Sequence, residues 1–361
     1  MNTIAELVLG IGRKYEGLPL DDLTAAESLR EDLAAADIAG LSLPEEYGGS
    51  GTLAELCQAI EAVGLTGMTA PGLLLSTGVV GRILAEHGTA VQKAALLPGI
   101  ATGEVRFCFA LTEAESGSNP MRMRTTAVRE GDDWIIRGEK TYISAVDHAT
   151  HMLLVTRAAD ALTLFVVELP AERVTKTPVT VYVPVAERQW TLHFDDLRLP
   201  ATAVIGEPGQ GGKALFTGLN AERLAVAAQS IGLGRWCLAK AVEHARSREV
   251  FGVPIGAHQA VQHPLADAHI ALESAAAVLW RAAGERDDRG TACTIAKIAA
   301  CDAGLQAADA ALQTFGGSGY TDETQVYQRF AFLRLAKSIP VTRELALNHV
   351  ATAALGLPRS Y

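Results

Sequence analysis

The hydrophobic pattern changes twice along the 361 residues, and these changes restrict the fold more than any other feature. From Thr3 to about Ile100, stretches such as LTAAESLREDLAAADIAG place apolar residues at helical spacing. From about Arg106 to Pro200, short β-branched runs such as LTLFVVELP are separated by turns, which is typical of strands. Amphipathic helical patterns return from about Leu215. The sequence therefore predicts helices, a compact all-β domain, and helices again.

Composition excludes several classes of function. The formal net charge is −10 and Lys and Arg are dispersed, which argues against binding to nucleic acid or to an anionic membrane. No uncharged apolar run is long enough for a membrane span, and MNTIAELVLGIGRKYEGL lacks the pattern of a secretory signal. The five cysteines form no CxxC pair. We interpret them as buried free thiols of a cytoplasmic protein, and we predict no metal site.

Two glycine-containing segments have some features of ligand-binding loops. A phosphate loop in GEPGQGGKA would need Gly at Glu207 and Ser or Thr at Ala214, so this segment is expected to be a connection into a helix. No GxGxxG follows a predicted strand, which argues against a Rossmann site. In FCFALTEAESGSNP, Phe107 to Pro120, an apolar run passes into small and hydroxylated residues. Such a loop can approach a polar ligand closely, although an ordinary Ser/Gly turn is the alternative.

Four further blocks follow this loop: GEKTYISAVDHATHMLLVTR, NAERLAVAAQSIGLGR, RSREVFGVPIGAHQAVQHPLADAH and QTFGGSGYTDETQVYQR. Together with LSLPEEYGGSG upstream, they resemble the acyl-CoA dehydrogenase family of flavoproteins over nearly the whole chain. The resemblance implies an α+β fold: an N-terminal helical domain (1–106), a central β-barrel-like domain (107–212) and a C-terminal four-helix bundle (213–361). It also implies a homotetramer, or a heteromer with a paralogue.

The resemblance implies FAD as the cofactor, lying between the β domain and the bundle and partly covered by a neighbouring subunit. Tyr142 stands where the family usually has Trp, and Ser144 replaces a Thr that donates toward flavin N5. An ordinary strand is the alternative there, as a helix C-cap is at Gly316. The implied cofactor contacts are Leu111, Thr112, Ser118, Tyr142, Ser144, Arg248, Phe251, Gln259, Gln313, Gly316, Gly317 and Thr342.

The expected catalytic carboxylate is missing from its usual place. Members of the family remove the α proton of an acyl thioester with a Glu in a Glu-Gly-Thr segment, and here Pro340-Val341-Thr342 stands at that point. Proline also lacks the N–H that would help to polarise the thioester carbonyl. Other members place the base on an earlier helix just before an arginine, which is Glu222 here. We therefore predict Glu222 as the base, with Glu344 as the runner-up and the absence of any carboxylate base as a third possibility.

The predicted function is α,β-dehydrogenation of an acyl-CoA thioester in lipid metabolism, with electrons passed to an electron-transfer flavoprotein. The predicted substrate contacts are Ser118, Arg223 and Val341. Three alternatives stay open: a dehydrogenase of acyl-carrier-protein thioesters, a flavin oxidase or monooxygenase, and a non-catalytic subunit of a heteromeric dehydrogenase.

Overall fold

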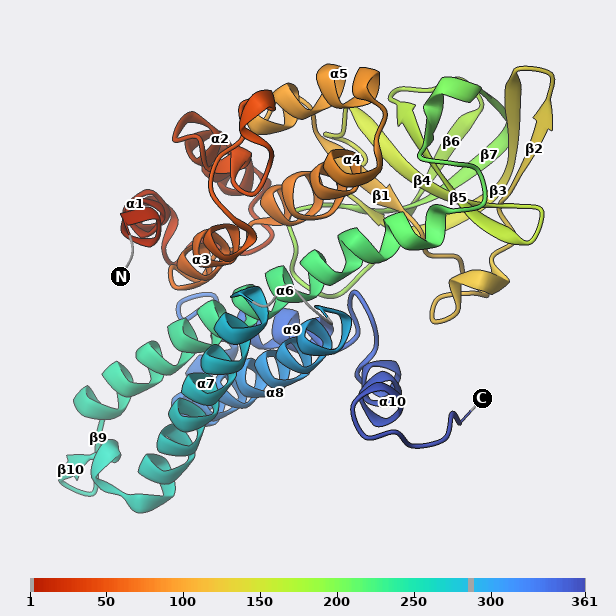
Figure 1. Cartoon of the computed structure of the whole chain (residues 1–361). Coiled ribbons are helices and arrows are strands. Elements are labelled where there is room, and N and C mark those ends of the chain that lie inside the picture. Colours follow the sequence, from red (N-terminus) through yellow and green to blue (C-terminus); the bar gives the residue numbers. More distant parts are fainter. Residues whose placement is uncertain (1–2, 285–288, 361) are drawn as a thin grey trace.

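Five α-helices precede the sheet in the computed structural model, which describes residues 3–284 and 289–360 (Figure 1). Two of them begin at capping boxes: Thr52 and Thr89 accept a hydrogen bond from the third residue of their helix, and Glu55 and Gln92 return one. These bonds satisfy N–H groups that a helix start leaves open. The helices are α1 (Thr3–Gly12), α2 (Leu23–Ala35), α3 (Leu53–Gly64), α4 (Arg82–His87) and α5 (Ala90–Ala101), with a π-helical segment (Leu73–Gly81) before α4.

An eight-stranded mixed sheet follows in the described chain, in the order β6-β7-β3-β2-β4-β5-β8, with β1 also pairing with β4. One set of its side chains, including Leu153 and Leu164, packs against the N-terminal helices and α6. The opposite set, including Trp134 and Phe165, fills the interior of the curved sheet. The strands are β1 (Phe107–Ala110), β2 (Thr126–Glu130), β3 (Asp133–Ser144), β4 (His151–Ala158), β5 (Ala161–Glu168), β6 (Val174–Val179), β7 (Gln189–Pro200) and β8 (Val204–Ile205).

A helical bundle completes the chain. Its core is shared with α2 and α3, so the two helical regions pack as one unit around Leu224, Leu272 and Leu333. A Cβ on Gly234 of α6 would lie 2.9 Å from the Cα of Gly304 in α8, so glycine allows these helices to approach closely. The elements are α6 (Gly211–Ser247), the β9–β10 hairpin (Glu249–Val250 and Val253–Pro254), α7 (Gln259–Gly284), α8 (Arg289–Phe315), α9 (Val326–Ala336) and α10 (Arg343–Ala353).

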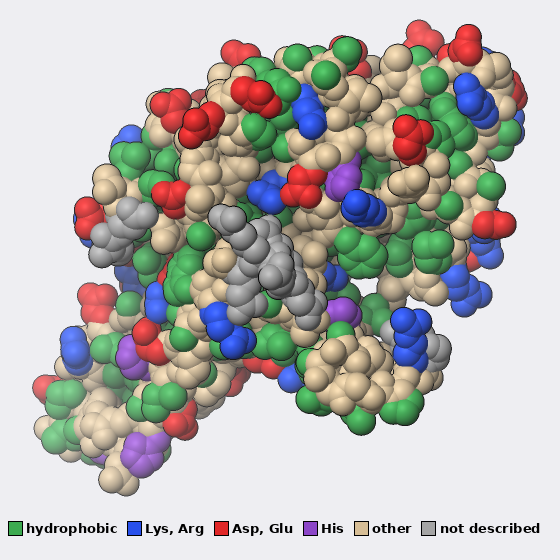
Figure 2. All heavy atoms as spheres, viewed as in Figure 1, with side chains coloured by type: hydrophobic (Ala, Val, Ile, Leu, Met, Phe, Trp, Pro, Cys, Tyr) green, Lys and Arg blue, Asp and Glu red, His purple; other side chains and the backbone are tan. Residues whose placement is uncertain are grey.

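The predicted α+β class is confirmed, with helices, a β domain and a bundle in the predicted order. The proposed borders stay predictions: residue 107 is the first of β1, and residue 212 lies in the first turn of α6. All five cysteines are buried, and no disulfide bond joins them in the described chain. No helix in the described part of the chain is long and apolar enough to cross a membrane. Figure 2 shows acidic and basic side chains scattered over the visible face rather than gathered by sign.

Candidate active site

The loop that follows β1 is held by a buried ion pair. Lys140 Nζ lies 2.8 Å from Glu113 Oε1 and also donates to Leu111 O at 2.9 Å. Glu113 accepts further hydrogen bonds from the N–H groups of Arg124 and Thr125, so the pair ties both ends of the loop to β3. Burial lowers the pKa of Lys140 to about 8, against the opposing effect of Glu113. Burial disfavours the ionised form of Glu113, but hydrogen bonds from the Arg124 N–H and Lys140 outweigh burial and lower its pKa.

A β-bulge in β3 turns Tyr142 out of the sheet. The pairing of β3 with β7 shifts register between Lys140 and Ile143. Within that shift, Tyr142 has a positive φ of 57° and is 60% exposed. Bulges re-aim side chains, and strained residues of this kind cluster at ligand sites. The Thr141 N–H donates to Thr112 O at 2.9 Å, which brings the loop after β1 beside the bulge.

Two predicted hydroxyl contacts lie in the same segments of the chain: Ser144 near the end of β3, two residues after Tyr142, and Ser118 in the loop after β1. Ser144 Oγ donates to Gln189 Oε1 at 3.0 Å and accepts from Gln189 Nε2 at 2.8 Å. Ser118 is exposed in the loop after β1. An exposed aromatic ring on a strand that also carries a hydroxyl group fits a planar, polar heteroaromatic ligand such as a flavin ring. The structure thus brings four of the predicted cofactor contacts together: Leu111, Thr112, Tyr142 and Ser144.

The second set of predicted cofactor residues lies at the far end of the bundle. Arg248 follows the last turn of α6, whose 37 residues span about 55 Å from the sheet to the β9–β10 hairpin (Figure 1). His244, one turn before Arg248, stacks on Phe315 with ring centroids 4.5 Å apart, which places Arg248 beside the turn at Gly316. The four residues at the bulge are called the Tyr142 edge below. Within a single copy of the chain, this edge lies far from the second set: Arg248, Phe251, Gln259, Gln313, Gly316 and Gly317.

Glu222, the predicted base, is a buried carboxylate on α6. It is 9% exposed, and its Oε2 has no hydrogen-bond partner among the described residues. Burial raises the pKa of Glu222 to about 7, and the positive charges of Arg223 and Lys297 oppose this rise. Arg223 donates to Asn220 Oδ1, while its Nε has no partner in the described chain. A carboxyl group that titrates near neutral pH can accept a proton from a bound substrate.

The segment around Pro340 is a turn between two helices. Pro340 lies between the end of α9 at Ala336 and the start of α10. Thr342 caps α10, where its Oγ1 accepts a hydrogen bond from the N–H three residues on at 3.4 Å. Glu344 is exposed in the first turn of α10. Of the two predicted bases, only the one on α6 is therefore removed from bulk water.

Two functional candidates were missed in the sequence, and both are lysines. Lys140 and Lys297 are almost fully buried, although an isolated lysine is normally a surface residue. Lys297 Nζ donates to Val341 O at 2.9 Å and to Lys337 O at 3.2 Å. The sequence does contain one signal for Lys297: cysteines stand four residues before and after it, on the same helical face.

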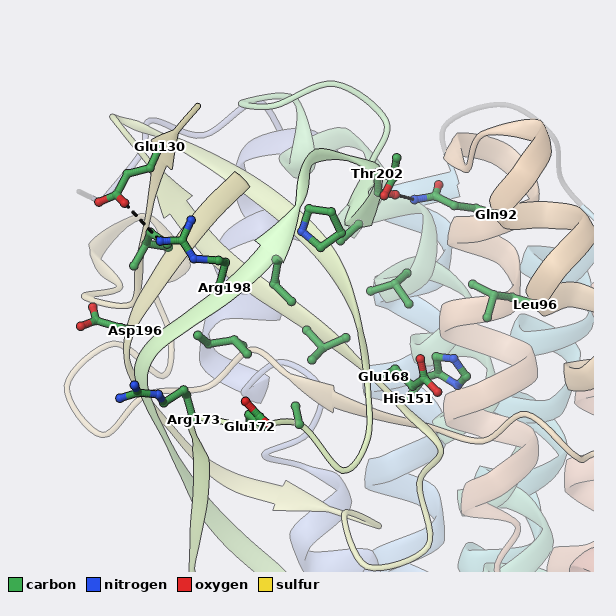
Figure 3. Close-up of a pocket in the computed structure, with 18 of the residues that line it drawn as sticks. Gln92, Leu96, Glu130, His151, Glu168, Glu172, Arg173, Asp196, Arg198 and Thr202 are labelled. Carbon is green, nitrogen blue, oxygen red and sulfur yellow. Dashed lines mark hydrogen bonds and ion pairs between the residues drawn. The ribbon is translucent and has the colours of Figure 1, made fainter. Parts of the chain in front are cut away.

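A separate cleft of about 760 Å³ opens between α5 and the sheet (Figure 3). Two ion pairs lie among its charged groups: Arg198 lies 3.5 Å from Glu130, and Arg137 pairs with Asp196. The cleft contains none of the predicted site residues. Within the described chain, no group of three or more His, Cys, Asp or Glu side chains is arranged to hold a metal ion. The candidate active-site residues are therefore those at the Tyr142 bulge and Glu222 on α6.

Three acyl-CoA dehydrogenase domains match the sequence: the N-terminal domain over residues 19–104, the middle domain over 108–197 and the C-terminal domain over 209–355. Acyl-CoA dehydrogenase FadE12 of Mycobacterium tuberculosis (strain ATCC 25618 / H37Rv) is 40% identical, covering 99% of this chain and 95% of FadE12. A solved chain described as an electron transferring flavoprotein of Acidaminococcus fermentans aligns over 98% of both chains, with a TM-score of 0.90 and 25% identity. A solved FAD-dependent dehydrogenase aligns over 99% of both chains, with a TM-score of 0.88 and 26% identity. The chain belongs to the acyl-CoA dehydrogenase family.

Proposed function

We propose that this protein oxidises an acyl-CoA thioester to its α,β-enoyl form with FAD as cofactor and Glu222 as the base. The observation that carries the proposal is the buried Glu222 carboxyl, which has one oxygen without a partner and a pKa raised to about 7. An unpaired buried carboxylate destabilises a fold, so a catalytic use is a physical reason for keeping it. The same reasoning does not apply to Glu344, because its side chain is exposed.

Glu222 is expected to act on the α carbon of the bound thioester. Above about pH 7 the carboxyl group is ionised and can accept the α proton. FAD, when bound, supplies the acceptor for the hydride that leaves the β carbon. Because Pro340 has no N–H, we expect the N–H of Val341 to face the thioester carbonyl instead. Arg223, beside the base, is expected to contact the substrate.

Two groups of residues are expected to hold the cofactor. The Tyr142 edge offers an exposed ring, a hydroxyl group and a firmly held loop to the flavin. Arg248 at the far end of α6 offers a guanidinium, which suits a diphosphate because it donates two parallel hydrogen bonds. Since one chain keeps these two groups far apart, a shared site requires a second copy of the chain. This separation supports the predicted homo-oligomer.

The electron acceptor is proposed to be an electron-transfer flavoprotein. The proposal is supported by the family and by the similarity to the Acidaminococcus fermentans chain. An oxidase is the main alternative, because it would pass the same electrons to oxygen.

Anaerobic titration of the FAD-loaded protein with saturated acyl-CoA thioesters of increasing length tests this function. We expect the yellow colour to bleach, and we expect fast reoxidation by electron-transfer flavoprotein and slow reoxidation by oxygen. Rapid oxygen uptake with peroxide release would establish an oxidase instead. Bleaching only by acyl-carrier-protein thioesters would change the substrate class. A preparation that binds FAD only together with a paralogue would indicate a non-catalytic subunit.

A further inference from the structure

Lys297 is a buried cation that the proposed reaction does not use directly. It is 1% exposed, and no ion pair joins it to a carboxylate in the described part of the chain. Its ammonium group donates instead to two backbone carbonyls, Lys337 O at 3.2 Å and Val341 O at 2.9 Å. Burying an ammonium group without an adjacent carboxylate costs several kcal/mol. The position of Lys297 therefore calls for a functional explanation.

The packing of α6 and α8 places Lys297 about one helical turn from the level of Glu222 along the contact between the two helices. Ser230 Oγ lies 3.6 Å from Cys301 Sγ, and Gly234 approaches Gly304 further along, so the two helices run in the same direction. Lys297 stands one turn before Cys301, and Glu222 stands two turns before Ser230. The two side chains therefore differ in level by about one helical turn along this contact.

Lys297 also anchors the turn that contains Pro340. Its two acceptors, Lys337 O and Val341 O, lie on either side of the proline. Val341 is the residue whose N–H we expect to meet the thioester carbonyl. The Lys297 side chain thus connects the turn that is expected to hold the substrate carbonyl with α8, which packs against the helix of Glu222.

We propose that Lys297 is a positioning residue that fixes the 337–341 turn and supplies a positive charge that favours the ionised form of Glu222. This inference rests on the proposed role of Glu222. The lowering effect of Lys297 on the pKa of Glu222 agrees with it.

Other charged and titratable groups lie near Lys297, and each either has a partner of its own or carries a positive charge that disfavours a second cation. Asp302 on α8 lies 2.6 Å from Lys337 Nζ and also pairs with Arg343. Cys301 donates its thiol to Ala336 O at 3.4 Å. Burial lowers the pKa of Lys297, Cys301 and Asp302 oppose this effect, and the positive charges of Arg223 and Lys337 lower the pKa further. The charged and titratable groups that act on Lys297 are therefore Arg223, Cys301, Asp302 and Lys337.

Three substitutions of Lys297 separate its two roles. Lys297→Gln removes the charge but keeps an N–H₂ donor for the two carbonyls, whereas Lys297→Met removes both. Lys297→Arg keeps the charge. Lys240→Met is the matched control, because Lys240 is a cation on α6 whose Nζ lies 3.4 Å from Glu16, outside the site.

The test is an infrared titration of the Glu222 carboxyl group in the resting FAD-loaded protein, with the signal assigned by its loss in Glu222→Gln. We expect a midpoint near pH 7 in the wild type and a higher midpoint in Lys297→Gln and Lys297→Met, because loss of the positive charge disfavours the ionised carboxyl group. Lys297→Arg and Lys240→Met should keep the wild-type midpoint. Lys297→Met should also unfold at a lower urea concentration than Lys297→Gln, because two carbonyls lose their donor.

An unchanged midpoint in Lys297→Gln, or a shifted midpoint in Lys297→Arg, would overturn the proposal. If Lys297→Met does not fold, the Gln and Arg variants still decide it. The titration needs no substrate, so it is independent of the proposed function. Wild-type protein that titrates as expected but never bleaches with a thioester would refute the function alone.

Discussion

Glu222 has a carboxyl oxygen without a hydrogen-bond partner in the described chain and a raised pKa. Both properties are useful in a catalytic base and unfavourable in a purely structural residue. The Glu222 side chain is buried. Its pKa is raised to about 7, with burial as the main cause. In the unfolded chain the same group ionises near its ordinary value of 4.5. Between these two values the native state binds a proton that the unfolded state has released, so the stability contributed by Glu222 falls as pH rises.

Glu222→Gln is therefore expected to stabilise the protein at pH 8 by up to about 3 kcal/mol while removing activity. At pH 4.5 and below the effect should be small, because the native carboxyl group is already neutral. Urea unfolding of both proteins across this pH range measures it. Glu344→Gln, at an exposed position, is the control and should show no such pH dependence. An equal change in stability at all pH values would contradict the buried, ionising carboxyl group.

At the scale of elements, the Glu113–Lys140 pair joins the loop after β1 to β3. Lys140→Met should destabilise the protein by about 3–5 kcal/mol, because it leaves a buried carboxylate uncompensated. Hydrogen exchange in residues 111–125 should become faster, and retention of FAD should fall. The double variant Glu113→Gln/Lys140→Met should cost less than Lys140→Met alone. Additive losses in the double variant would show that the pair is not coupled.

Arg329 connects α9 to the N-terminal helical region. Its Nε donates to Gly67 O at 2.9 Å and its Nη2 to Leu18 O at 2.7 Å, while the guanidinium lies 4.7 Å from the Trp236 ring. Arg329→Met should lower the free energy of unfolding by about 3–5 kcal/mol, because buried carbonyls lose their donors. Arg334→Met, an exposed change on the same helix, should stay within about 0.5 kcal/mol of the wild type in urea unfolding. Equal effects of the two variants would refute the role assigned to Arg329.

At the scale of the whole molecule, the long α6 helix separates the two predicted cofactor surfaces. If two copies share each FAD, a Tyr142→Ala chain and an Arg248→Ala chain should complement each other when refolded together. Random pairing of equal amounts should restore about a quarter of the sites, since each mixed pair contains one fully wild-type site. Flavin content and thioester bleaching of the mixture measure this. Activity no greater than that of the separate variants would place both surfaces in one chain or exclude one of them.

The sequence predicted the order of the three regions because each has a distinct hydrophobic period, and the structure confirms that order. It also indicated Glu222 as a candidate base through a block that resembles the family, and that role stays a prediction. It did not predict that Tyr142 lies in a bulge, because β3 continues with ordinary strand residues on both sides. It also missed the burial of Lys140, Lys297 and Arg329. Burial of a charged side chain depends on partners far along the chain, as Leu18 O and Arg329 show, and local pattern does not contain that information.

We propose that Glu222 removes the α proton, and single-turnover flavin reduction measures that step. The wild type, Glu222→Gln and Glu344→Gln would be mixed anaerobically with the acyl-CoA that bleaches the wild type fastest. We expect Glu222→Gln to bind the thioester but to be reduced about 10²–10⁴-fold more slowly. We expect Glu344→Gln to react at the wild-type rate, and the wild-type rate to rise with pH through about 7. Near-wild-type reduction of Glu222→Gln, or the large loss in Glu344→Gln instead, would contradict the account.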